Sequence, residues 1–148
     1  MCLFPMMGGF NMQPIVPPSS KGLQYKQRLY IVLAVHVVFA IFMMIFEPMN
    51  GIMELISVAI LWCAIAQMHY CQLIIYIIIL CHKLVLNLVT LGYIIQRQWF
   101  GLMFQSTYSA ARLLLIMLIS VFYSVAIVLS FYAYREFKGM LYDSGVQP

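Results

Sequence analysis

Four long apolar segments, separated by short polar stretches, dominate the pattern of hydrophobic and polar positions along this chain. A hydrocarbon core about 30 Å thick is crossed by roughly 20 helical residues, so each segment is long enough for one crossing. The pattern predicts an all-α fold, a polytopic integral membrane protein with four transmembrane helices in a compact bundle. We expect these helices at residues 29–46, 52–68, 72–95 and 110–134.

Short polar stretches set the predicted boundaries. Residues 47–51, Glu-Pro-Met-Asn-Gly, indicate a turn because Pro interrupts a helix and Asn-Gly favours a chain reversal. The stretch 52–97 is too long for one crossing, so we predict a second turn at the polar residues 69–72. Residues 96–99 end the third helix, and we expect the connector 100–108 to lie at the level of the lipid headgroups.

Two tails flank the predicted transmembrane domain at residues 29–134. Residues 1–28, rich in Met, Pro and Gly, predict a flexible tail, and residues 135–148 predict a short one. Because Lys and Arg concentrate on the cytoplasmic side of a membrane, their distribution predicts that both tails are cytoplasmic. The side shared by the tails has Lys21, Lys26, Arg28, Arg135 and Lys138, whereas the other has Arg97 and Arg112.

Composition excludes an ordinary soluble domain. The chain is 65% hydrophobic and only 8% charged, whereas soluble domains contain about 25% charged residues. Its mean hydropathy is +0.98, so the expected surroundings are a lipid bilayer. The net charge of +4 is small, and no basic cluster has interleaved aromatic residues. We therefore expect no nucleic-acid partner.

Polar residues inside the apolar segments are the main candidates for chemistry. A polar stripe on the third predicted helix has successive spacings of 4, 7, 4 and 3 residues, which places its members on one helical face: Gln72, Tyr76, Lys83, Asn87 and Thr90. A cation near the membrane midplane costs at least ~2.5 kcal/mol, so Lys83 should face protein or water. Its flexible stem could reach Glu54, the only acid within the predicted spans. Either a substrate or proton site, or a buried pair that fixes helix register, fits this pattern.

Two histidines are expected at similar depth in different helices. His36 and His82 lie about 7 and 10 residues from the same side, a difference of about 5 Å along a helix. Two such imidazoles could ligate a haem. Alternatively, each hydrogen-bonds a neighbouring helix, and on this interpretation the chain has no cofactor.

The motifs of known catalytic and metal sites are absent from the sequence. It contains no Gly-x-Ser-x-Gly nucleophile turn, no glycine-rich phosphate loop, and no C-x-x-C or H-x-x-x-H spacing. We therefore predict no enzyme, no catalytic residue and no metal site. Tyr134-Arg135-Glu136-Phe137 fits a tyrosine sorting motif, in which Tyr134 and Phe137 would contact a cytoplasmic sorting adaptor. The same four residues could instead form the last turn of a helix.

The four-span layout with cytoplasmic tails is similar to that of small tetraspan proteins of the Golgi and of vesicles, in architecture only. It implies a non-enzymatic protein of the secretory or endosomal system, in a Golgi or endosomal vesicle rather than the mitochondrial inner membrane. It would act in trafficking or assembly through contacts with other membrane proteins or as a homo-oligomer. A strip of small residues on the second predicted helix is typical of helix-packing surfaces and consists of Ala59, Cys63 and Ala66. The fourth predicted helix has a hydroxyl-bearing side of the same kind, formed by Ser120, Tyr123 and Ser124.

Two alternatives remain open. The chain could be an accessory subunit of a larger membrane complex, for example a respiratory enzyme. It could also be a small carrier or haem-binding membrane protein that uses Lys83, Glu54, His36 and His82.

Overall fold

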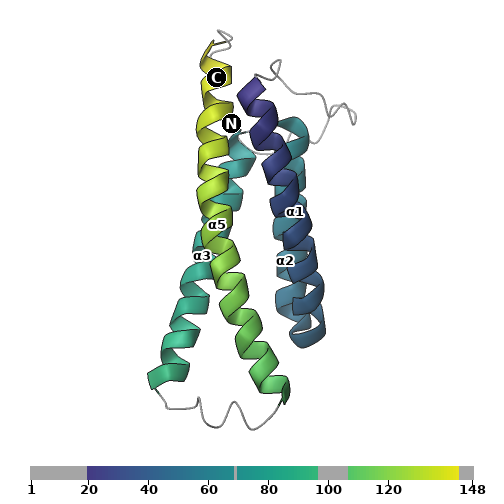
Figure 1. The fold of residues 1–148 in the computed structure, drawn as a ribbon, viewed down its shortest axis with the longest axis vertical. Coiled ribbons are helices and arrows are strands. Elements are labelled where there is room, and N and C mark those ends of the chain that lie inside the picture. Colours follow the sequence, from purple (N-terminus) through teal and green to yellow (C-terminus); the bar gives the residue numbers. More distant parts are fainter. Residues whose placement is uncertain (1–19, 69, 97–106, 144–148) are drawn as a thin grey trace.

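The computed structural model describes residues 20–68, 70–96 and 107–143, and its regular secondary structure over these residues is entirely helical (Figure 1). Each of the four helices is long and apolar enough to cross a membrane. The predicted all-α fold is thus confirmed for the described part of the chain, and membrane insertion is inferred from composition. The helices are α1 (Ser20–Phe46), α2 (Pro48–Gln67), α3 (Tyr70–Gln96) and α5 (Thr107–Asp143).

The helices form two hairpins that stand side by side. In Figure 1, α1 and α2 make one hairpin and α3 and α5 the other. The main contacts join α1 to α2, α2 to α3, α3 to α5 and α5 back to α1, so the helices are arranged as a ring. The start of α1 and the end of α5 lie at the same end of the bundle, and α3 and α5 diverge at the opposite end (Figure 1).

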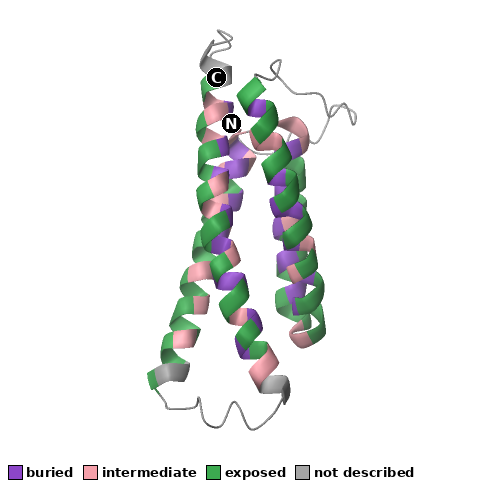
Figure 2. Ribbon diagram, in the orientation of Figure 1, coloured by how far each residue is buried: buried purple, intermediate pink, exposed green. Residues whose placement is uncertain are grey.

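The buried side chains face the inside of this ring. Its core contains Leu29, Leu61, Leu73, Leu80 and Ile119, each no more than 1% exposed. Figure 2 shows the buried positions facing neighbouring helices and the exposed positions on the outer faces. The outer faces also carry large apolar side chains. Such extensive apolar exposure is rare in soluble monomers and fits surroundings of hydrocarbon.

The two outer helices extend beyond the predicted membrane spans. The first helix begins nine residues before the predicted start at position 29, and the last continues nine residues past its predicted end at position 134. Residues 20–28 and 135–143, predicted as parts of the two tails, are therefore helical. Neither stretch contains proline, and Gly22 and Phe137 within them are buried, so packing continues past the apolar run.

The turn between α1 and α2 is shorter than predicted. Glu47 is the only residue between the two helices, and Pro48 begins α2. Proline is favoured at the first helical position, where its missing N–H would have had no helical acceptor. The Glu47 carboxylate accepts a hydrogen bond from the Asn50 amide and pairs with the Arg112 guanidinium of α5. The predicted five-residue turn was wrong because Pro48 starts a helix here instead of ending one.

The second turn lies slightly earlier than predicted. The second helix ends at Gln67, and Met68 adopts a left-handed backbone conformation with φ 50° and ψ 38°. Its N–H bonds to carbonyl groups of the last helical turn, as is common at helix ends. The third helix begins at Tyr70, two residues before the predicted start. His69 and the larger part of the predicted connector, up to residue 106, lie outside the described residues.

A first prediction concerns the close approach of α1 and α2 at Gly51. A Cβ atom at this position would lie 2.6 Å from the backbone N and Cα atoms of Met44, so Gly51→Ala must push the two helices apart. We expect a loss of about 1–3 kcal/mol in the free energy of unfolding, typical of overpacking. Thermal unfolding of the detergent-purified protein measures this change.

Gly139→Ala is the matched control, because a Cβ atom at Gly139 meets no atom within 4 Å. This variant should be as stable as the original protein or slightly more stable, since Ala favours a helix. Equal effects of the two substitutions would contradict the proposed steric role of Gly51.

Candidate functional site

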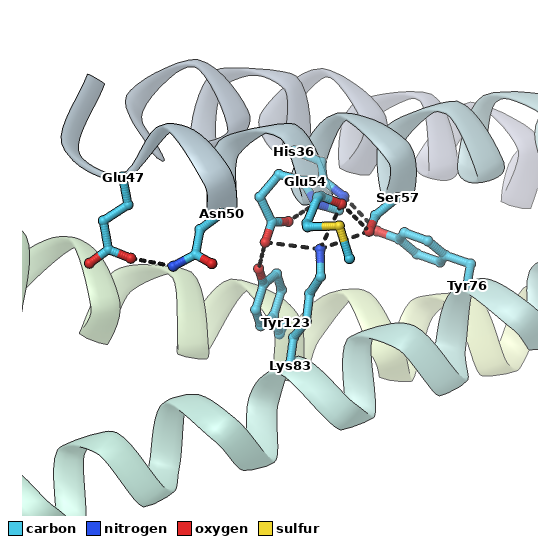
Figure 3. Close-up of polar contacts among 9 residues, drawn as sticks. His36, Glu47, Asn50, Glu54, Ser57, Tyr76, Lys83 and Tyr123 are labelled. Atoms are coloured by element: carbon cyan, nitrogen blue, oxygen red, sulfur yellow. Dashed lines mark hydrogen bonds and ion pairs between the residues drawn. The ribbon is translucent and has the colours of Figure 1, made fainter. Parts of the chain in front are cut away.

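Polar side chains from all four helices converge on the carboxylate of Glu54 (Figure 3). Exposure is 3% for Glu54 and at most 1% for the other members except Lys83, whose side chain is 15% exposed. The group therefore lies within the protein. We call it the Glu54 cluster, and its members are His36 of α1, Glu54 and Ser57 of α2, Tyr76 and Lys83 of α3, and Tyr123 of α5.

The Glu54 carboxylate receives a donor from each of the other three helices. Oε1 accepts the Tyr123 hydroxyl at 2.6 Å and lies 2.9 Å from the Lys83 ammonium. Oε2 lies 2.8 Å from Nε2 of His36. Because a buried carboxylate without partners is strongly unfavourable, these contacts are what allow Glu54 to lie inside the bundle.

His36 joins the carboxylate to Tyr76. A carboxylate oxygen only accepts, so Nε2 of His36 carries the proton and donates to Glu54. The Nδ1 atom lies 3.0 Å from the Tyr76 hydroxyl, which donates to it when the ring is neutral. The imidazole also packs against the rings of Phe122 and Tyr123, with centroids 5.3 and 6.2 Å away. Both ring nitrogens are therefore satisfied inside the protein.

The Lys83 ammonium uses all three of its N–H donors. It donates to the Ser57 hydroxyl at 2.8 Å and to the Met53 carbonyl at 3.1 Å, and it pairs with Glu54. The Ser57 hydroxyl in turn donates to the same carbonyl at 3.1 Å. The cluster pairs one ammonium with one carboxylate, and this pairing reduces the cost of burying both charges.

Helix periodicity explains how each element presents its part of the cluster. Glu54 and Ser57 are three residues apart on α2, and Tyr76 and Lys83 are seven apart on α3, so each pair lies on one helical face. Chemically, the cluster links two hydroxyls, an imidazole and a carboxylate in a continuous hydrogen-bonded path. Such a path can fix four helices relative to one another, and it can also hold or pass a proton.

Among the residues proposed from sequence, the structure brings together Glu54, Lys83 and His36, and Tyr76 of the predicted polar stripe joins them. Two further stripe residues of α3 lie outside the cluster. Asn87 is half-buried outside the cluster, and Thr90 is exposed, with its hydroxyl donating to the Leu86 carbonyl at 2.9 Å. The single polar face predicted for this helix is therefore divided between the interior and the outer surface.

His36 and His82 do not lie together as a pair of haem ligands would. Both nitrogens of His36 contact protein groups, whereas His82 is exposed on α3. Similar depth did not bring them together because a helix directs residues to different sides at the same height. Among the described residues, no group of three or more His, Cys, Asp or Glu side chains could hold a metal ion.

The sorting-motif residues are part of a helix. Tyr134 and Phe137 lie within α5, and Phe137 is only 3% exposed. The Tyr134 ring contacts the Tyr70 ring, with centroids 6.3 Å apart. The Lys138 ammonium lies 5.9 Å from the centroid of the Tyr134 ring. An adaptor that binds an extended segment could not contact both side chains in this conformation. These four residues are helical, as the alternative held, but α5 continues to Asp143, so they are not its last turn.

Two cluster members were not identified as such from sequence. Ser57 lies one turn after Glu54, and this i, i+3 spacing was a usable signal. Tyr123 was recognised only as part of a hydroxyl-bearing side of the fourth helix. Nothing in the sequence states which side of that helix faces Glu54, because this depends on how α5 packs.

No family model, curated protein or solved structure matches this chain. The function of the chain is therefore inferred from the residues and geometry described above.

A second prediction tests the hydrogen bond from Tyr123. Tyr123→Phe removes one donor to the buried carboxylate and should lower the free energy of unfolding by about 1–3 kcal/mol. Tyr132→Phe is a matched control on the same helix, since Tyr132 is 50% exposed. Thermal unfolding in detergent should separate the two variants, and equal stability would show that the Tyr123 contact contributes little.

A third prediction concerns the ion pair. From sequence alone, Lys83→Leu should be tolerated, because it removes a cation from hydrocarbon. The structure predicts instead that Lys83→Leu or Glu54→Gln alone costs about 3 kcal/mol, since each leaves the other charge buried with fewer partners. The loss in free energy of unfolding of the double variant should be smaller than the sum of the two single losses by at least about 1 kcal/mol. Additive losses in thermal unfolding would contradict this coupling.

Proposed function

We propose that this chain is a non-enzymatic membrane protein with four spans that acts through contacts with other membrane proteins in trafficking or assembly. The single observation that carries this proposal is the closed arrangement of the Glu54 cluster. Its carboxylate, ammonium and imidazole groups all bond to groups of the same chain. Chemistry on an external substrate would require some of these groups to be released.

The ends of the helices support an orientation with both tails on the cytoplasmic side. Lys21, Lys26 and Arg28 lie in the first turns of α1, and Arg135 and Lys138 near the end of α5. These two ends lie together in Figure 1, whereas Arg112 lies near the opposite end, where it pairs with Glu47. Cations concentrated at one end of the bundle favour that end as cytoplasmic.

The outer faces support a role in contacts within the membrane. Ala59 and Cys63 of the small-residue strip on α2 are exposed, and Ala66 is half-buried. These residues are therefore not used to pack the chain's own helices closely. Small side chains allow another helix to approach closely in a membrane. We propose a Golgi or endosomal membrane as the location. If the chain is instead an accessory subunit of a larger membrane complex, it would use the same outer helix faces to bind the other subunits.

A second candidate function is a small carrier that moves protons or small ions. The observation in its favour is the continuous path from Tyr76 through His36 to Glu54 and Lys83, which joins three residues proposed from sequence. Buried ionisable groups in membrane proteins often mark such pathways. This candidate requires the cluster itself for activity, whereas the first requires only that the bundle is folded.

A fourth prediction separates the two functions with the double variant Glu54→Gln/Lys83→Leu. If the cluster is structural, the variant should keep the same location and the same proteins co-purified from native membranes as the original chain. In proteoliposomes, neither protein should transport protons faster than empty vesicles. Proton transport by the original chain that is lost in the variant, at equal amounts of folded protein, would favour the carrier.

A further inference from the structure

We infer that the outer face of α3 is the contact surface for a second copy of this chain. This inference rests on the proposed role in protein contacts and names one partner for it. We call the surface the α3 seam. It consists of Ile75, Ile78, His82, Val85, Val89 and Gly92.

The seam has the spacing of a helix–helix interface. Successive members are 3, 4, 3, 4 and 3 residues apart, the repeat that keeps one face of a helix against a parallel partner. All six residues are exposed, and exposure reaches 61% at Ile78 and 64% at Val89. Of the four candidate spans, α3 is the least covered by its own chain, with 17% of its most apolar window buried against 33–39% in the others.

His82 shows that this face is not simply covered by lipid. It lies twelve residues after the start of α3 at Tyr70 and fourteen before its end at Gln96, and therefore close to the middle of the helix. Among the described residues of this chain, His82 has no hydrogen-bond partner and is exposed. Imidazole groups at membrane depth almost always face protein or water, because hydrocarbon offers them no partner. The seam therefore requires a partner that can hydrogen-bond at this depth.

A second copy of the chain provides that partner by symmetry. All copies in one membrane have the same orientation, so two α3 helices related by a two-fold axis along the membrane normal run parallel. Each His82 then faces the His82 of the other copy at equal depth. A neutral imidazole has one donor and one acceptor nitrogen, so one ring can donate to the other.

The rest of the seam fits close packing of two identical helices. Val85 and Val89 are β-branched residues at core positions of the repeat, and their stiff side chains lose little rotamer freedom when a second helix packs against them. A Cβ atom at Gly92 would meet nothing within 4 Å in its own chain, so a second helix can approach its backbone. Figure 2 shows mostly exposed and half-buried residues along the second half of α3.

Cysteine cross-linking of the full chain in its native membrane tests the geometry. Cys63 and Cys81 are exposed free thiols, and both can be replaced by Ala. The resulting double-Ala variant serves as the background and measures any cross-linking through the remaining cysteines. One of two substitutions is then added to this background. Val89→Cys lies within the seam, whereas Thr90→Cys is also exposed but lies about 100° further around the helix. Under mild oxidation, Val89→Cys should give at least about tenfold more covalent dimer than Thr90→Cys, whose yield should stay near background.

The hydrogen bond is tested by co-purifying two differently tagged copies. His82→Leu should reduce their association by about threefold, the effect of losing one interhelical hydrogen bond, and His82→Asn should retain it because an amide also both donates and accepts. Thr90→Val is the control and should leave association unchanged. If the His82→Leu copies associate as well as the original chain, His82 does not contribute a hydrogen bond between the two copies.

The possible failures are distinguishable. Equal or absent cross-linking at Val89 and Thr90, with other membrane proteins still co-purifying, would overturn the seam but leave the proposed function standing. Absence of both the dimer and any stable partner would overturn both.

Discussion

The structure depends on the burial of one carboxylate. Glu54 lies inside the ring of helices, where it accepts donors from α1, α3 and α5. Apolar contacts alone would let the helices of such a bundle rotate or slide, because one apolar side chain substitutes readily for another. A buried carboxylate tolerates few arrangements, since every lost donor leaves a charge without a partner. The Glu54 cluster therefore selects one relative placement of the four helices.

The sequence was sufficient for the number and type of elements and weaker for their ends. Four apolar runs of suitable length predicted four helices, because hydrocarbon thickness limits the length of a span. The same argument made the first and last helices too short, since hydrogen bonding within a helix continues after the apolar run stops. At Pro48 the sequence was ambiguous, because proline both interrupts helices and begins them. The structure resolves this ambiguity, because α2 begins at Pro48.

The candidate site was predictable in part. Charged and histidine residues inside apolar runs are rare enough to identify Glu54, Lys83 and His36 as important without a structure. Their grouping depends on rotation of each helix about its axis, which one sequence does not specify. For the same reason, similar depth left open whether His36 and His82 could act as a pair, whereas they lie on the inside and the outside of the bundle. Tyrosine is too common in apolar helices to have identified Tyr123.

The single-residue connection at Glu47 has a consequence for how the protein is made. With so short a link, α1 and α2 can enter a membrane only as one hairpin, and synthesis delivers this hairpin before α3 exists. At that stage, His36 is the sole member of the Glu54 cluster outside α2 that has been synthesised. The imidazole thus shields the carboxylate during biogenesis, and Lys83 and Tyr123 complete its coordination only as the second hairpin arrives.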